Sequence, residues 1–116
     1  MKPFPEEHLT GKQIAAIQKK AWSRTFRHAF AHSPFYREHF RRAGFSPKKP
    51  VPLEQLGQIP TIGKEVLSEN SEAFLCVPRE RVVDIVTTSG STGQPMVWML
   101  TDQDMQRLAL NEYHSF

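Results

Sequence analysis

Hydrophobic residues in the first part of the chain recur with a helical period. Within residues 10–31 the apolar positions fall three or four apart and form one broad face, made of Ile14, Ile17, Ala21, Trp22, Phe26, Ala29 and Phe30. The opposite side is mostly basic, with Lys19, Lys20, Arg24 and Arg27. This spacing predicts one long amphipathic helix over residues 10–31.

The segments that follow carry residues that begin and end helices. Ser33 suits an N-cap and Pro34 a first helical position, so we expect a second helix over residues 34–43 that stops at Gly44. Three prolines make residues 45–52 a linker. We then expect shorter elements: a helical turn at 53–56, a helix that Thr61 caps and that runs to Glu69, and a loop or short strand over 70–78 anchored by Phe74, Leu75 and Val77.

After a polar turn at residues 79–81 the apolar residues follow a strand pattern. A β-branched run over residues 82–86 predicts a buried strand, and residues 96–100 predict a second one. Thr101 is a suitable N-cap for a final helix, with Asp104 reaching back to it. The sequence therefore predicts a mixed α/β fold in which a helical N-terminal half precedes an antiparallel strand–loop–strand and a helix.

The loop between the two strands consists of hydroxyl residues and glycines. Gly90 and Gly93 can adopt positive φ and let the backbone approach a ligand, and successive N–H groups can form an anion-binding nest. The Ser and Thr hydroxyls between Thr88 and Thr92 add hydrogen-bond donors. The loop is not a Walker A motif, because Gly93 precedes Gln-Pro and a strand. Composition alone leaves two interpretations open, a phosphate-binding loop and a flexible Ser/Gly hairpin tip.

Composition and charge limit the classes of protein to which this chain can belong. The 116 residues are 39% hydrophobic and 23% charged, which fits one globular domain, and no apolar run is long enough for a membrane helix. We expect no secretion signal and a cytoplasmic location, since Cys76 is the lone cysteine. Residues 1–50 carry 11 basic and 3 acidic residues, a net +8, whereas residues 51–116 carry 4 and 9, a net −5. The basic residues interleave with an apolar stripe, which favours a solvated face over a nucleic-acid site.

Three further groups of residues have both a structural and a chemical interpretation. His28 and His32 have metal-ligand spacing, but Ala29 stands where a zinc protease has Glu, so we expect no metal site. Cys76 lies in an apolar run that raises a thiol pKa, which favours a structural role over a nucleophile. The aromatic residues of the first helix, Trp22, Phe26 and Phe30, favour core packing over a ligand groove. Those of the second helix, Phe35, Tyr36 and Phe40, favour core packing or a surface that further polypeptide covers.

Several motifs, in order, resemble those of one enzyme family. Residues 88–95, Thr-Ser-Gly-Ser-Thr-Gly-Gln-Pro, resemble the phosphate-binding loop of adenylate-forming enzymes. The flanking motifs resemble those of phenylacetate-CoA ligases: residues 25–30, 33–37, 43–44, 59–61, 64–67, 74–78 and 108–113. The resemblance runs from about residue 17 to residue 116. The chain is accordingly identified as the N-terminal portion of the large domain of such an enzyme, with an arm at 1–9 and an incomplete domain at 10–116.

The resemblance implies a function for the whole enzyme. It would be an ATP-dependent acid–CoA ligase that uses Mg²⁺, with ATP, CoA and an aryl or acyl carboxylic acid as partners and with neither nucleic acid nor membrane involved. The residues implied to bind the ATP phosphates are Thr88, Ser89, Gly90, Ser91, Thr92 and Gly93. Met96 departs from the pattern, since many members of the superfamily carry Lys or Arg there. The downstream family motifs, including the catalytic Lys, do not occur in these 116 residues.

Two expectations follow for the chain by itself. We expect no catalysis from it, because the residues that bind adenine, ribose and the acid are absent. We also expect exposed apolar surface and self-association, because strands that are apolar on both faces are normally covered on both sides. The alternative interpretation is a non-catalytic binding or interaction module, or one subunit of a split ligase.

Overall fold

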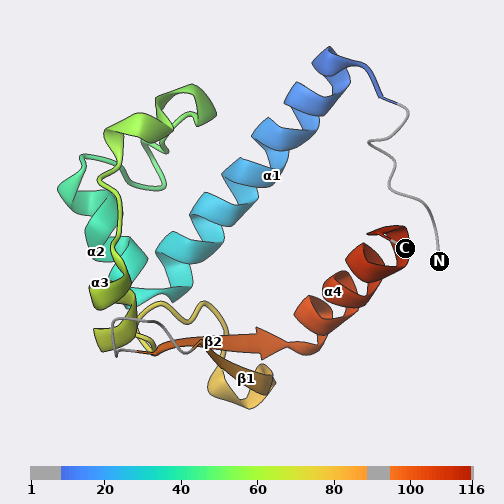
Figure 1. The fold of residues 1–116 in the computed structure, drawn as a ribbon. Coiled ribbons are helices and arrows are strands. Elements are labelled where there is room, and N and C mark those ends of the chain that lie inside the picture. Colours follow the sequence, from blue (N-terminus) through green and yellow to red (C-terminus); the bar gives the residue numbers. More distant parts are fainter. Residues whose placement is uncertain (1–8, 89–94, 116) are drawn as a thin grey trace.

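The computed structural model describes residues 9–88 and 95–115 (Figure 1). The elements in chain order are α1 (Gly11–His32), α2 (Pro34–Arg42), η2 (Leu53–Gln58), α3 (Lys64–Glu69), η3 (Arg79–Arg81), β1 (Val82–Thr88), β2 (Met96–Thr101) and α4 (Asp102–Ser115). The predicted mixed α/β class, with helices first and an antiparallel pair and a helix after them, is confirmed. Most of the predicted arm, and the loop over residues 89–94, lie outside the described residues.

The first two helices begin and end close to the predicted positions, and side chains explain why. Ser33 caps α2 by accepting a hydrogen bond from the Tyr36 N–H at 3.1 Å. Gly44, at φ 91, ends it in the left-handed region that glycine tolerates. At the start of α1, Thr10 and Gln13 form a reciprocal capping box that the helical spacing did not reveal.

The core of the molecule lies where α1, α2 and the following linker meet. Phe26 is fully buried and its ring centroid lies 4.7 Å from that of Phe40. The predicted linker is more than a connection, because it supplies Phe45 and Val51 to the same core. The Trp22 indole N–H donates to the Val51 carbonyl at 2.8 Å, which fixes the linker against α1. We refer to residues 11–78 as the helical region.

The third helix differs from its prediction. Gly63, not Thr61, occupies the N-cap position, its backbone is extended, and no side chain caps the helix. The His39 ring nitrogen Nε2 donates to the Pro60 carbonyl at 2.8 Å, which ties this segment to α2. We attribute the later helix start to this tertiary contact, which holds the chain extended after Pro60.

The two strands pair antiparallel, as predicted, with Ile85 opposite Met99 and Val86 opposite Trp98. The register is irregular between Val82 and Asp84. Both α3 and α4 pack on β2, whereas β1 packs chiefly on β2. We refer to residues 82–88 and 95–115 as the hairpin region.

The prediction that the first strand is buried is wrong for this chain. Val83 is 58% exposed, Ile85 53% and Val86 41%, because neither face of β1 is fully covered by another element. The paired residue Trp98 on β2 is also 45% exposed. The expected exposure of apolar surface is therefore confirmed.

The last helix begins with the predicted capping box. Asp104 accepts hydrogen bonds from the Thr101 N–H at 2.9 Å and from the Thr101 hydroxyl at 3.0 Å, and its own N–H donates back to Thr101 Oγ1 at 3.3 Å. From this cap, α4 extends away from the sheet, and α1 projects from the body on the same side (Figure 1). None of the described helices is long and apolar enough to cross a membrane.

The overall dimensions show an open arrangement. The accessible surface is 8866 Å², about a third more than the roughly 6500 Å² expected for a folded monomer of this mass. The radius of gyration is 16.3 Å, against about 13 Å for a compact domain of this length.

Candidate functional site

The structure describes the two ends of the predicted phosphate-binding loop. Thr88 ends β1 and pairs with Met96, the first residue of β2, and the Thr88 hydroxyl accepts a hydrogen bond from the Met96 N–H at 3.3 Å. Of the six predicted phosphate-binding residues, Thr88 is described, whereas Ser89, Gly90, Ser91, Thr92 and Gly93 lie outside the described residues. The antiparallel pairing thus brings the loop ends together, and the nest within the loop stays a prediction.

A contact from α3 fixes the second end of the loop. The Ser68 hydroxyl donates to the carbonyl of Pro95 at 3.2 Å. Sequence reasoning missed this contact, since a serine within a short helix carries no signal for a partner 27 residues later. The residues at the two ends of the loop therefore contact a β-ladder and a helix, and rigid elements position ligand-contacting backbone better than free loops do.

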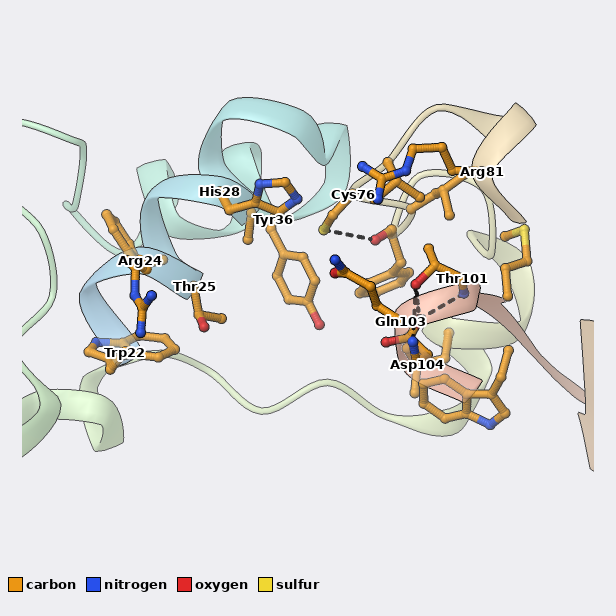
Figure 2. A pocket seen from close by; sticks show the side chains of 18 of the residues that line it. Trp22, Arg24, Thr25, His28, Tyr36, Cys76, Arg81, Thr101, Gln103 and Asp104 are labelled. Atoms are coloured by element: carbon orange, nitrogen blue, oxygen red, sulfur yellow. Dashed lines mark hydrogen bonds between the residues drawn. The ribbon is translucent and has the colours of Figure 1, made fainter. Parts of the chain in front are cut away.

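An open cleft of about 1160 Å³ separates the helical region from the hairpin region. Aromatic residues of α1 and α2 line one side, where α1 also contributes Arg24, Thr25 and His28. The other side has Val97, Trp98 and Met99 of β2, together with polar residues from η3, β2 and α4. Figure 2 shows the Tyr36 side chain pointing into this cleft, between Thr25 of α1 and Gln103 of α4. The cleft therefore combines apolar surface from both regions with basic groups, among them Arg24 and Arg81.

Two partly buried titratable groups of the cleft, Tyr36 and Cys76, are held in their neutral forms. Burial raises the pKa of the Cys76 thiol, and a hydrogen bond with Ser33 opposes this only in part. Burial also raises the pKa of the Tyr36 hydroxyl, and the nearby Cys76 adds to that effect. The Cys76 thiol donates to the Phe74 carbonyl at 3.4 Å. A protonated, partly buried thiol fits the structural role predicted for Cys76 and not that of a nucleophile.

The histidine pair lies as the helical spacing predicts, on one side of α1. The rings of His28 and His32 are 4.5 Å apart between centroids. Across residues 9–88 and 95–115, no three His, Cys, Asp or Glu side chains gather as a metal-binding group.

Comparisons with known proteins give one consistent relationship. No protein-family model matches the chain. It is 34% identical to the phenylacetate-coenzyme A ligase of Escherichia coli over 90% of its own length, and 34% identical to that of Pseudomonas putida over 80%. The chain spans only 24% and 21% of those two proteins.

A solved structure agrees with the sequence matches. The chain superposes on 2-hydroxyisobutyryl-CoA ligase, in complex with 2-HIB-AMP and CoA, with a TM-score of 0.68. The superposition has 29% sequence identity and covers 84% of this chain and 23% of the ligase. The chain is thus a homologue of the phenylacetate-CoA ligases and, in fold, the counterpart of about a quarter of an adenylate-forming CoA ligase.

Proposed function

We propose that this chain supplies the phosphate-binding part of an ATP-dependent acid–CoA ligase, with residues Thr88–Gly93 on the ATP phosphates. The observation that carries the proposal is the similarity to the E. coli phenylacetate-coenzyme A ligase. A match over 90% of the chain necessarily includes residues 88–93. The hairpin register supports the proposal, because it brings both ends of that loop to one place.

The proposed reaction has two steps. The carboxylate of the acid attacks the α-phosphorus of ATP and releases pyrophosphate, which leaves an acyl adenylate. The CoA thiol then attacks the acyl carbon, forms the thioester and displaces AMP. The loop's role in the first step is to hold the β- and γ-phosphates in line through backbone N–H groups and hydroxyls.

The substrate and the remaining groups are proposed by class. The solved relative carries a 2-hydroxyisobutyryl adenylate, whereas the sequence relatives are named for phenylacetate, so we propose an acyl or aryl carboxylic acid. Mg²⁺ would accompany the ATP phosphates, since it usually keeps several waters and needs few protein ligands. With Met96 in place of a basic residue, the backbone of the loop and its hydroxyls carry the contact with phosphate.

A chimera tests this function. The stretch of the E. coli ligase that matches this chain is replaced by the chain, and adenylate formation is measured by pyrophosphate exchange. We expect an active chimera, and we expect the double variant Gly90→Val/Gly93→Val to lose about 10²-fold or more in rate, because added side chains block the backbone donors. Thr61→Val is the matched control, since Thr61 is exposed and lies outside the loop.

Three results would contradict the proposal. An active chimera that tolerates both glycine substitutions would remove the phosphate-binding role from residues 88–93. Thioester formation by the 116-residue chain alone would show a complete site within it. A folded but inactive chimera would favour the alternative, a non-catalytic binding module.

A further inference from the structure

We propose that the open edge of β1 docks a strand from the remaining part of an acid–CoA ligase, and that this strand places a basic side chain against Asp84. The choice of partner rests on the proposed function. The surface concerned, which we call the β1 surface, comprises Val83, Asp84, Ile85, Val86 and the neighbouring Trp98.

The β1 surface has the composition of an interior strand. Val83, Ile85 and Val86 are 58%, 53% and 41% exposed, although β-branched residues on both faces of a strand are typical of a covered sheet. One edge of β1 pairs with β2, and among the described elements no strand pairs with its other edge. A two-stranded ribbon is marginal in water by itself, so this edge is suited to a further strand.

Asp84 shows what kind of strand fits there. It lies within the apolar run, and its carboxylate accepts a hydrogen bond from the Ile85 N–H at 2.9 Å. Four described carboxylates have an Arg or Lys partner: Glu38, Glu54, Glu72 and Asp104. The other described carboxylates have none, and of these Asp84 is the one that lies in a strand, within an apolar run. A strand with Lys or Arg opposite Asp84 would supply the missing charge.

The same carboxylate disfavours a second copy of this chain as the occupant. If two β1 edges paired antiparallel with their apolar runs overlapping, the two Asp84 side chains would lie opposite or nearly opposite each other. Like charges in such positions destabilise a β-pair, and a charge on an edge strand is a common means of blocking edge-to-edge pairing. Self-association through the apolar faces is therefore expected to be weak and without a defined β1 register.

The size of the uncovered surface agrees with a large partner. The apolar residues of the β1 surface are 41–58% exposed. Two residues of α4, Met105 and Leu108, add exposed apolar area next to the hairpin. A 14-residue helix is marginal in water without packing. The relatives carry roughly three quarters of their length beyond the part that matches this chain, which is enough polypeptide to cover these surfaces.

The test uses the full 116-residue chain, co-expressed with the E. coli phenylacetate-coenzyme A ligase from which the matching stretch is removed. We expect a 1:1 complex in which amide hydrogen exchange of residues 83–87 slows at least tenfold relative to the chain alone. Asp84→Lys should weaken the complex at least tenfold and Asp84→Asn less. Glu69→Lys, which makes the same charge change at an exposed position of α3, should leave the complex intact.

The intact chimera described above provides a second measurement that does not require two separate pieces. There, too, residues 83–87 should be protected from exchange, and Asp84→Lys should lower the midpoint of thermal unfolding more than Glu69→Lys does. Protection of β1 and sensitivity to Asp84 in either experiment support the proposal.

Three results would overturn it: no complex and no β1 protection in the chimera, a complex in which residues 83–87 exchange as in the free chain, or a discrete homodimer with protected β1 amides. These readouts are binding and exchange, not activity. Retention of activity in the loop variants with an intact, β1-protected complex would therefore refute the proposed function and leave the docking surface standing.

Discussion

The helical region and the hairpin region are both rich in apolar residues, yet they bury them to very different extents. In the helical region Phe26, Phe40, Phe45 and Val51 are at most 5% exposed, and aromatic stacking and the Trp22 hydrogen bond connect the elements. In the hairpin region the apolar residues of β1 are 41–58% exposed, with the sole exception of Val82.

The difference shows which part of the chain specifies its own structure. The helical region holds its own core, so it should fold without help. The hairpin region has the ladder and the capping box but lacks a covered face, so its order depends on what covers it. The proposed phosphate-binding loop belongs to this second region, and the residue at its second end, Pro95, contacts the helical region through Ser68.

The strongest test of this contrast compares a core residue with an exposed strand residue. Phe26→Ala should lower the free energy of unfolding by about 3–5 kcal/mol, because it leaves a cavity at a fully buried site. Ile85→Ala should cost less than about 1 kcal/mol, since the side chain is already half exposed. Urea denaturation followed by circular dichroism measures both. Equal losses would mean that the two regions form one cooperative core.

The next test concerns the apolar surface of the hairpin region. We expect the isolated chain to self-associate, and the double change Ile85→Thr/Trp98→Thr to lower the association constant by about tenfold, or roughly 1.4 kcal/mol. Sedimentation over a concentration series and binding of a dye to exposed apolar surface give the readouts. Ile17→Gln is the control, because Ile17 is also exposed, at 41%, but lies on α1. A monomer at all concentrations would contradict this expectation.

A comparison of two serines tests whether a buried hydrogen bond contributes more to stability than an exposed one. Ser33 is fully buried, caps α2 and donates to the Ala73 carbonyl at 2.7 Å, so Ser33→Ala should cost about 1–2 kcal/mol. Ser68→Ala removes a single contact that water can replace, and should cost less than about 0.5 kcal/mol. Thermal or urea unfolding of the two variants provides the comparison, and a larger loss for Ser68→Ala would show that the loop end carries more stability than its exposure implies.

The smallest expected effect is a pH dependence that arises in the helical region. Because the pKa of Cys76 lies above its ordinary value of 9.0 in the folded chain, the folded state holds more protons than the unfolded state above that pH. The contribution of the protonated Cys76 thiol to stability is therefore fully present below pH 9.0. It is lost as the pH rises through the raised pKa. The unfolding midpoint, measured on both sides of that pH, should fall less in Cys76→Ala than in the parent chain. An identical fall would assign the pH dependence to Tyr36 and other groups.

The amino-acid sequence by itself determined the local features of this protein. Ser33, Pro34 and Gly44 bound α2, and Thr101 and Asp104 begin α4, because caps and turns depend on residues within one or two helical turns. The β-branched run and the hydroxyl-rich loop likewise predicted the strands and their antiparallel pairing, since side-chain period and turn residues act over a few positions.

Only the tertiary structure decided which of these residues meet over long distances in the chain. It brought Phe45 and Val51 of the linker into the core, joined His39 of α2 to the Pro60 carbonyl, and left β1 uncovered. Burial depends on every element that packs against a residue. A strand pattern can therefore predict that a surface is apolar, but the elements present around it decide whether it is covered.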